Sequence, residues 1–285
     1  MAGGLASLRT RVARTVDAAS CVRERGRFVV RELAGRQATA VYQLRDVPFR
    51  AAIRHPLFDM WVLDEVFRNR VYALPAAVEA RLKELGRPVR VLDLGGHAGL
   101  FALWLRATLP DAHVTSYEPD PENASVLRQC VRVNRLDAHW EVVEAAASTA
   151  EGTAQFVSDG PLSQFADTPD ALRDEHAVLE QIFPFLRGRR LLTPHEVMVR
   201  TTDVMPLLAQ CDFLKLDIQG GEWPLLTDPR IEALGAVALV IELHPQAAPV
   251  DDPLMWTTTL LERLGYALEV MPAHGRERII WATRP

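Results

Sequence analysis

Hydrophobic and polar positions follow two different rhythms along this chain, and the rhythm changes near residue 89. In residues 5–25 apolar side chains recur every three or four residues, which predicts one amphipathic helix; they are Leu5, Leu8, Val12, Val16 and Ala19. From residue 28 to residue 55 the apolar runs are short and favour strands. Residues 41–44 and 49–53 are expected to form a hairpin.

Two further helical patterns complete the first quarter of the chain. One begins at Asp59, a candidate N-cap, and runs to Phe67, and the other covers about residues 76–85 and ends before Gly86. We therefore expect residues 1–75 to form a helical and hairpin appendage. Such an appendage would serve as a cap or as the contact surface of a homodimer.

After residue 89, strands and helices alternate, which predicts a Rossmann-like, doubly wound α/β fold with a mostly parallel sheet over residues 76–285. The expected strands are residues 89–94, 113–118, 140–145, 154–157, 213–217 and 236–243. A final hairpin, residues 266–271 and 278–282, is expected at the edge of the sheet. Residues 158–195 fit neither a strand nor a short connection, so we interpret them as a lid-like insertion over the site.

Composition is that of an ordinary globular protein, with 285 residues, 48% hydrophobic, 24% charged and a net charge of −5. No apolar run approaches the roughly 20 residues of a membrane-spanning helix. Arginines at positions 9, 11 and 14 interrupt any signal-peptide core. The three cysteines are far apart and lack metal-ligand spacing, which favours a reducing compartment and a cytoplasmic location.

The positive charge is concentrated near the N-terminus, where residues 1–45 carry nine arginines against three acids. A basic segment can bind a phosphate-bearing partner, but it is more often a solvated helix face. These arginines are not interleaved with aromatic residues as in platforms that stack nucleic-acid bases. We therefore predict no nucleic-acid partner and no membrane partner, and a small molecule as substrate.

A glycine-rich turn, Asp93-Leu94-Gly95-Gly96-His97-Ala98-Gly99, follows the first strand of the alternating region. Glycines let the backbone approach a ligand, and ligands bind at the carboxyl ends of strands where the strand order reverses. A dinucleotide fingerprint requires G-x-G-x-x-G. His97 breaks that pattern, which disfavours an NAD-linked oxidoreductase. Asp93 is instead suited to the ammonium group, or a bridging water, of a cofactor that carries an amino acid.

The next strand ends in Glu118-Pro119-Asp120, where a carboxylate can accept both hydroxyls of a ribose. Asp93 and Glu118 in register on successive strands indicate one nucleoside pocket more specifically than either acid alone. We assign the cofactor pocket to Asp93, Gly95, Gly96, His97, Gly99, Glu118, Pro119, Ala145, Ala146 and Asp217. Because every one of these residues follows residue 89, we expect residues 1–70 to take no part in the pocket.

From about residue 55 to residue 282, the chain resembles the FkbM-type methyltransferases, which are class I S-adenosylmethionine-dependent enzymes. The resemblance lies in the glycine-rich turn, in Glu118-Pro119, in Leu214-Lys215-Leu216-Asp217-Ile218-Gln219-Gly220-Gly221-Glu222 and in Val240-Ile241-Glu242-Leu243-His244-Pro245. It implies S-adenosylmethionine as cofactor and methyl transfer, typically to a hydroxyl of a natural product or sugar. N-methylation on the same fold is the alternative. His97 stands where the family usually has Asn, and Gln219 where it often has Glu.

Asp217, Glu222 and His244 are the candidate catalytic residues, because all three are expected at the carboxyl edge of the sheet. An alcohol is a poor nucleophile until its proton leaves, so a base among them would help. Glu242 and His195 are further candidates for the base. Glu222 also fits a plain structural role, as an acid in the first turn of a helix. No tight ligand spacing supports a metal, and we assign none.

Overall fold

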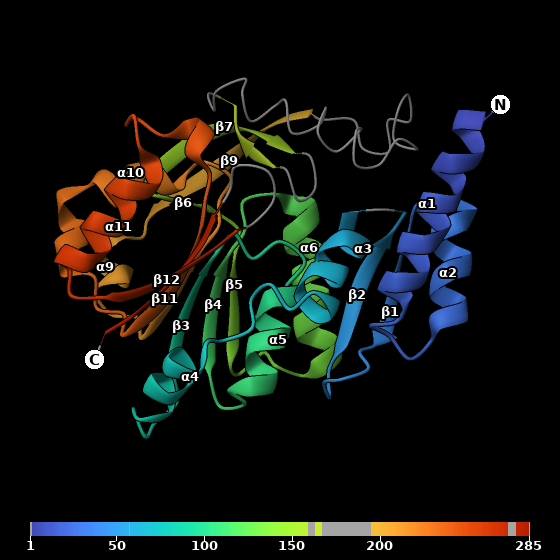
Figure 1. Cartoon of the computed structure of the whole chain (residues 1–285), viewed down its shortest axis with the longest axis horizontal. Coiled ribbons are helices and arrows are strands. Elements are labelled where there is room, and N and C mark those ends of the chain that lie inside the picture. Colours follow the sequence, from blue (N-terminus) through green and yellow to red (C-terminus); the bar gives the residue numbers. More distant parts are fainter. Residues whose placement is uncertain (1, 57, 159–162, 167–194, 273–277, 285) are drawn as a thin grey trace.

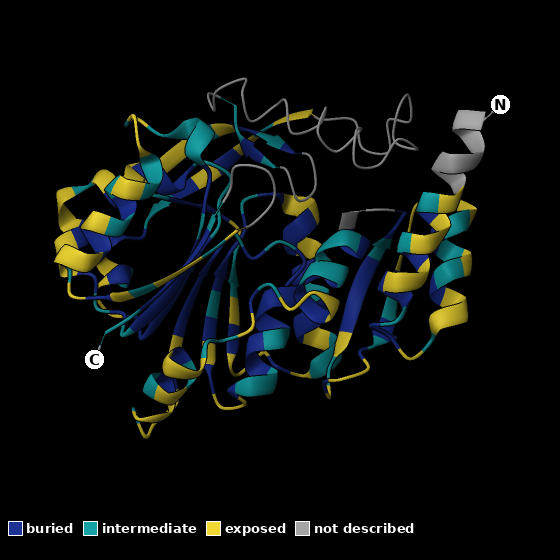
Figure 2. Cartoon of the chain, in the orientation of Figure 1, coloured by how far each residue is buried: buried dark blue, intermediate teal, exposed yellow. Residues whose placement is uncertain are grey.

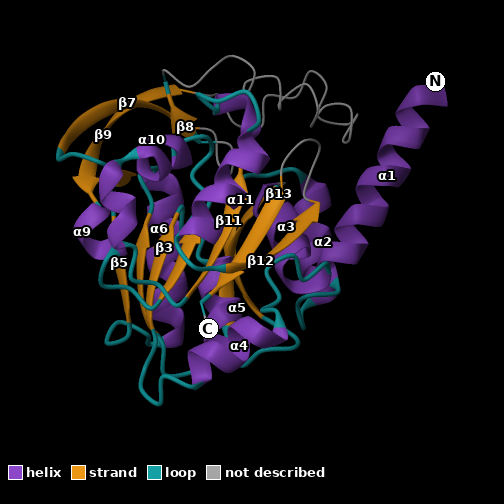
Figure 3. Ribbon diagram, turned by 60° about the vertical axis from the view of Figure 1, so that its left-hand side comes forward, coloured by secondary structure: helices purple, strands orange, loops and turns teal. Residues whose placement is uncertain are grey.

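The computed structural model describes residues 2–56, 58–158, 163–166, 195–272 and 278–284. A seven-stranded sheet lies at its centre, in the order β12-β13-β11-β10-β3-β4-β5. Helices cover both faces of this sheet (Figures 1 and 3). The strands are β3 (Arg90–Leu94), β4 (His113–Tyr117), β5 (Trp140–Val143), β10 (Phe213–Leu216), β11 (Ala238–Leu243), β12 (Ala267–Pro272) and β13 (Arg278–Thr283).

The five strands from β11 to β5 are parallel, and β13 runs antiparallel to both of its neighbours. The predicted fold class and the antiparallel hairpin at the sheet edge are therefore confirmed. The strand order reverses between β3 and β10, which is the place where open α/β sheets bind ligands. The helices packed around the sheet are α4 (Ala76–Lys83), α5 (Leu100–Thr108), α6 (Pro121–Asn134), α9 (Met205–Leu208), α10 (Glu222–Thr227) and α11 (Pro253–Arg263). Short 3₁₀ turns cover Pro229–Ala233 and Pro245–Ala247.

Strand residues alternate between two apolar cores, one on each face of the sheet. Val91 packs in the core beneath α5 and α6, whereas Leu92 and Leu94 pack in the core beneath α10 and α11. Because side chains on a strand have a period of two, Asp93 shares the α5 face with Val91. Figure 2 shows that these central strands are buried while the outer helix faces are exposed.

The N-terminal appendage comprises α1 (Ala2–Ala19), α2 (Arg25–Ala34), β1 (Ala38–Gln43), β2 (Arg50–His55), α3 (Phe58–Leu63) and a π-helical turn (Asp64–Arg68). The predicted hairpin is present as β1 and β2, paired antiparallel. It packs against α6, where the Ala52 N–H lies 3.2 Å from the Cys130 sulfur and Asn134 bonds both backbone groups of Arg50. Its side chains join the same apolar core as α5 and α6.

The single helix predicted over residues 5–25, with strand-like texture from residue 28, is wrong. Helix α1 ends at Ala19, and residues 25–34 form a second helix. On α2, Phe28 and Glu32 are buried four residues apart, which is a helical spacing that the β-branched run between them obscured. On α1, Val12 and Val16 from the predicted apolar stripe are 36% and 53% exposed.

A second, four-stranded sheet has the order β6-β9-β7-β8. Its strands are β6 (Ala146–Ser148), β7 (Gly152–Ser158), β8 (Gln164–Phe165) and β9 (His195–Asp203). The strand predicted at residues 154–157 therefore belongs to this sheet and not to the central one, because it pairs antiparallel with β9. Apart from residues 158, 163–166 and 195, the predicted insertion and its helical stretch lie outside the described residues. No helix within the described ranges is long and apolar enough to cross a membrane.

Candidate active site

The glycine-rich turn brings the ends of neighbouring strands together. The N–H groups of Gly95 and Gly96 both donate to the carbonyl of Tyr117, at the end of β4. Gly95 has a φ of +87°, and a Cβ there would lie 1.8 Å from the carbonyl oxygen of Asp217, just after β10. Only glycine combines this backbone conformation with so close an approach. At Gly99 a Cβ would lie 2.8 Å from the Trp140 ring, so this glycine also permits packing against β5.

Asp93 lies directly beneath the turn and is fully buried. Its Oδ2 accepts a hydrogen bond from Ser116 (2.6 Å), while its Oδ1 has no hydrogen-bond partner among the described residues and lies 3.9 Å from the ammonium of Lys215. Lys215 donates to the carbonyl of Gly95 at 2.7 Å. Burial raises the pKa of Asp93, with Lys215 opposing that shift. The turn is thus supported from below by a buried cation and a buried acid.

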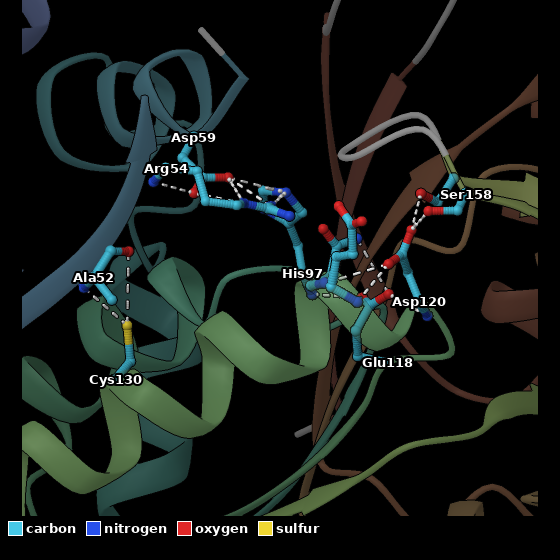
Figure 4. Close-up of polar contacts among 11 residues, drawn as sticks. Ala52, Arg54, Asp59, His97, Glu118, Asp120, Cys130 and Ser158 are labelled. Carbon is cyan, nitrogen blue, oxygen red and sulfur yellow. Dashed lines mark hydrogen bonds and ion pairs between the residues drawn. The ribbon is translucent and has the colours of Figure 1, made fainter. Parts of the chain in front are cut away.

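Glu118 ends β4 beside the turn, where the sequence predicts a ribose-binding acid. Its Oε2 accepts from the His97 N–H (2.7 Å), and its Oε1 accepts from the Asp120 N–H (3.0 Å). Burial raises the pKa of Glu118 to about 7. Pro119 separates it from Asp120, whose carboxylate caps α6 and accepts from Ser158 on β7 (Figure 4). The acid is therefore held rigidly at the edge of the turn.

His97 is held from the other side by the appendage (Figure 4). Its Nε2 lies 3.1 Å from Nη2 of Arg54 and 3.5 Å from Oδ1 of Asp59. Burial lowers the pKa of His97 to about 4, so the ring is neutral at pH 7 and can accept from the guanidinium. Asp59 does not cap its helix, because its carboxylate instead accepts from the backbone N–H and guanidinium of Arg54. The expectation that residues 1–70 stay apart from the pocket does not hold at this turn.

Ala145 and Ala146 lie where β5 ends, next to the end of β4. Both are buried, and the Ala145 N–H donates to the carbonyl of Val143. Strand β5 stops at Val143, two residues earlier than predicted, and Ala146 opens β6 of the second sheet. Both residues have small side chains, as the predicted cofactor pocket requires beside Glu118.

Asp217 and Glu242 lie near the ends of the neighbouring strands β10 and β11. Tyr72 from the appendage contacts both of them. The Tyr72 hydroxyl lies 2.5 Å from Glu242 Oε2 and 3.2 Å from Asp217 Oδ2. Burial would raise the pKa of Asp217, but Lys215, 3.0 Å away, holds it below its ordinary value. Burial and the charge of Asp217 raise the pKa of Glu242 to about 7. The two acids therefore differ in protonation at neutral pH.

Glu222 and His244 lie together but are both buried, with 0% and 1% of their side chains exposed. Glu222 accepts from the N–H groups of Ile218 (2.8 Å) and Gly220 (3.0 Å), and its Oε1 lies 3.0 Å from His244 Nδ1. It thereby fixes the turn after β10, in which Gln219 has a φ of +53°. This geometry favours the structural interpretation of Glu222 over a catalytic one.

Asp217, Glu222 and His244 offer ligand atoms that all lie within 4.8 Å of one another, so the three predicted catalytic residues do come together. As a metal site the cluster fits poorly, because the oxygens of Glu222 are already hydrogen-bonded and the ammonium of Lys215 lies against Asp217. His195 does not join them, since it begins β9 in the second sheet and is exposed.

Arg54 and Tyr72 were missed by the sequence analysis, because no local pattern places either residue beside motifs that follow far along the chain.

A family comparison shows to which family the chain belongs. The model of the methyltransferase FkbM domain matches residues 93–268, from the glycine-rich turn to β12. The chain belongs to this family. The matched domain is a methyltransferase domain, so the match supports S-adenosylmethionine as cofactor and disfavours the NAD-linked alternative.

Two curated proteins are similar in sequence to this chain. The release factor glutamine methyltransferase of Deinococcus radiodurans is 28% identical over 204 residues, which are 71% of this chain and 60% of that protein. The AMB antimetabolite synthetase AmbE of Pseudomonas aeruginosa is 26% identical over 209 residues, 65% of this chain and 9% of that protein. The chain thus spans less than two thirds of either relative. Among solved structures, the S-adenosylmethionine-dependent methyltransferase from Agrobacterium tumefaciens superposes with a TM-score of 0.42 at 13% identity, covering 87% of this chain and 70% of that one.

The residues of the FkbM methyltransferase pocket fit S-adenosylmethionine as cofactor. Within the described part of the chain, the buried Asp93 Oδ1 and His97 Nδ1 both lack a hydrogen-bond partner, so each could still bond a polar group of a ligand at the turn. Glu118, at the end of the adjacent strand, offers carboxylate oxygens of the kind that ribose hydroxyls require. Gly95 keeps the turn free of side-chain atoms. The predicted cofactor residues thus gather along the ends of β3, β4, β5 and β10.

Proposed function

We propose that this methyltransferase acts on a hydroxyl group of a small molecule, such as a natural product or a sugar, and that Glu242 accepts the hydroxyl proton. The supporting observation is the position of Glu242 at the end of β11, with a pKa of about 7 caused by burial and by Asp217. A base is most effective when its pKa lies near the working pH. Glu242 meets that condition.

The other candidates are less suited to proton transfer. Asp217 pairs with Lys215, which keeps its pKa low and its carboxylate a weak base. Glu222 and His244 are buried and hydrogen-bonded to each other, and Glu222 also accepts from a backbone N–H. We therefore assign Asp217 to orienting the acceptor through its remaining oxygen, and Glu222 with His244 to holding the turn that carries Asp217.

When bound, S-adenosylmethionine supplies an electrophilic methyl group on its sulfonium. Methyl transfer is an in-line displacement, so the main work of the protein is to position the two reactants. Tyr72 is a positioning residue in this scheme, because its hydroxyl fixes the carboxylate of Glu242 at 2.5 Å. Ionised Glu242 would take the proton from the acceptor hydroxyl, and the neutral thioether S-adenosylhomocysteine would be the leaving group of the transfer.

Replacing Glu242 by Gln tests the proposal, because the amide keeps the shape and removes the basicity. We expect the rate of methyl transfer to a panel of hydroxylated natural products and sugars to fall by roughly 10²–10⁴. In the wild type, the rate should rise with pH through about 7, as Glu242 ionises, and level off above. That ascending limb should vanish in E242Q, while affinity for S-adenosylhomocysteine stays unchanged.

The exposed Glu269 on β12 provides a matched control, since E269Q makes the same chemical change away from the site. A wild-type rate and pH profile in E242Q at saturating acceptor would refute Glu242 as the base.

N-methylation is the second candidate. It is favoured by the acidic surroundings of Tyr72, where Asp217, Glu242 and Glu65 all act on its hydroxyl. Such a pocket would also attract a protonated amine. The same panel should therefore include amines, and fragmentation of the methylated product in a mass spectrometer assigns the new methyl group to oxygen or nitrogen.

A further inference from the structure

Charge is distributed unevenly around the glycine-rich turn. Asp93 and Glu118 are acids on the strand ends, and Asp120 is a third acid just beyond. Among the described residues, two cationic side chains contact the turn. Lys215 donates a hydrogen bond to the carbonyl of Gly95, and Arg54 is hydrogen-bonded to the ring of His97. The methionine part of the cofactor carries an ammonium and a carboxylate. Acids suit the ammonium, but the carboxylate requires a cation or another strong donor.

Lys215 is not available for that carboxylate. Its side chain is 3% exposed, and its ammonium already contacts the carbonyls of Leu94 and Gly95 and the carboxylate of Asp217. These contacts place it beneath the turn, within the sheet. A cation in that position supports the backbone and cannot reach a ligand that lies above it.

Arg54 is placed differently, because its side chain is 21% exposed and comes from the end of β2. Asp59 accepts two hydrogen bonds from one edge of the guanidinium, with Nε at 3.0 Å from Oδ2 and Nη2 at 2.7 Å from Oδ1. The same Nη2 lies against the neutral ring of His97. The guanidinium is thus fixed in one orientation, and among the described contacts its Nη1 makes no hydrogen bond.

The acids around the glycine-rich turn stabilise the positive charge of Arg54. Burial opposes its charge, yet Asp59, and beyond it Asp120 and Glu118, raise the pKa of Arg54. Glu118 is also tied to His97 through the N–H of that residue. Figure 4 shows Arg54, His97 and Glu118 following one another across the turn. The guanidinium therefore lies within electrostatic reach of Glu118, the acid predicted to bind the ribose.

We infer that Arg54 binds the carboxylate of the cofactor's methionine moiety, with Asp59 and His97 as positioning residues. A preorganised guanidinium is well suited to a carboxylate because it presents planar donors at a fixed geometry. Helix α5 begins at Leu100, immediately after the turn, and its positive end adds to the attraction. The appendage would thereby complete the cofactor pocket, independently of which acceptor is methylated.

Two ligands that differ only at the methionine end test this inference by calorimetric titration. S-adenosylhomocysteine has the amino-acid group, whereas 5′-methylthioadenosine keeps the adenosine and the thioether but lacks it. In R54M we expect affinity for S-adenosylhomocysteine to fall about 10- to 100-fold, the range for a charge-assisted hydrogen bond. Affinity for 5′-methylthioadenosine should stay within about twofold, because that ligand has no carboxylate.

The control is R50M, which removes an exposed arginine from the same strand and should leave both affinities unchanged. Equal losses for both ligands in R54M would show that Arg54 only supports the turn, and no loss for either would show that the carboxylate is bound elsewhere. If R54M fails to fold, the same titrations on R54K decide the matter. A single ammonium cannot serve Asp59 and the carboxylate together, so a selective loss of S-adenosylhomocysteine affinity is again required.

Discussion

Three carboxylates at the carboxyl edge of the sheet differ in charge because their nearest neighbours differ. Asp217 has Lys215 at 3.0 Å and a lowered pKa. Glu242 and Glu118 contact no cation among the described residues, and burial raises their pKa values to about 7. An arrangement of acids with separated pKa values is typical of sites that bind and transfer protons. The identity of the nearest residue, more than the position on the strand, sets each role.

At the same scale, Gly95 is expected to be irreplaceable for a steric reason. Gly95 and Gly265 both have a φ of +87°, but a Cβ at Gly95 would meet the carbonyl of Asp217 at 1.8 Å, while at Gly265 no atom of the described residues lies within 4 Å. Both alanine variants carry the backbone strain, so their difference isolates the contact. We expect G95A to lose roughly 1–3 kcal/mol more than G265A in urea unfolding. Equal losses would mean that the turn and β10 can separate without cost.

At the scale of elements, the alternation of strands and helices after residue 89 could be predicted from the sequence, because each strand is a short apolar run bounded by a helix. The second sheet could not be predicted from the sequence, since its strands β7 and β9 pair although a long stretch of chain separates them. Helix α2 was missed because Phe28-Val29-Val30 has a strand-like composition, and its burial against the hairpin decides otherwise. Local pattern thus predicts elements well, but not the pairings between distant ones.

In the candidate site too, residues set by a local pattern could be predicted, and residues brought in from distant parts of the chain could not. Asp93, Glu118 and Asp217 could be predicted, because strand ends in register meet at one edge of a parallel sheet. Tyr72 could not, since it lies 145 residues from Asp217 and 170 from Glu242 along the chain. Arg54 could not either, because its position depends on how the hairpin packs on α6. Residues contributed by the appendage are visible only in the folded molecule.

At the scale of the whole molecule, the appendage and the sheet share one apolar core. Tyr42 and Ile53 of the hairpin belong to the same buried cluster as Leu103 of α5 and Val131 of α6. Removing residues 1–75 would expose that face of α6 and also delete Arg54 and Tyr72. The appendage is therefore integral to the enzyme in this structure (Figure 1).

A chain beginning at Ala76 should accordingly lose cooperative thermal unfolding and bind S-adenosylhomocysteine at least about tenfold more weakly, by the loss of one charged contact. Circular dichroism on heating and calorimetric titration measure the two effects. A shortened chain that unfolds cooperatively and retains wild-type affinity would show that the sheet builds the pocket alone.

The central claim is that the ends of β3 and β4 hold S-adenosylmethionine, with Glu118 on the ribose. Its most direct test is calorimetric titration of the wild-type protein and of E118A with S-adenosylhomocysteine, with NAD titrated in parallel. We expect binding of S-adenosylhomocysteine and not of NAD, and an affinity in folded E118A weaker by roughly 1.5–3 kcal/mol, the range for hydrogen bonds to a charged group. Unchanged affinity in E118A, or binding of NAD in place of S-adenosylhomocysteine, would contradict the account.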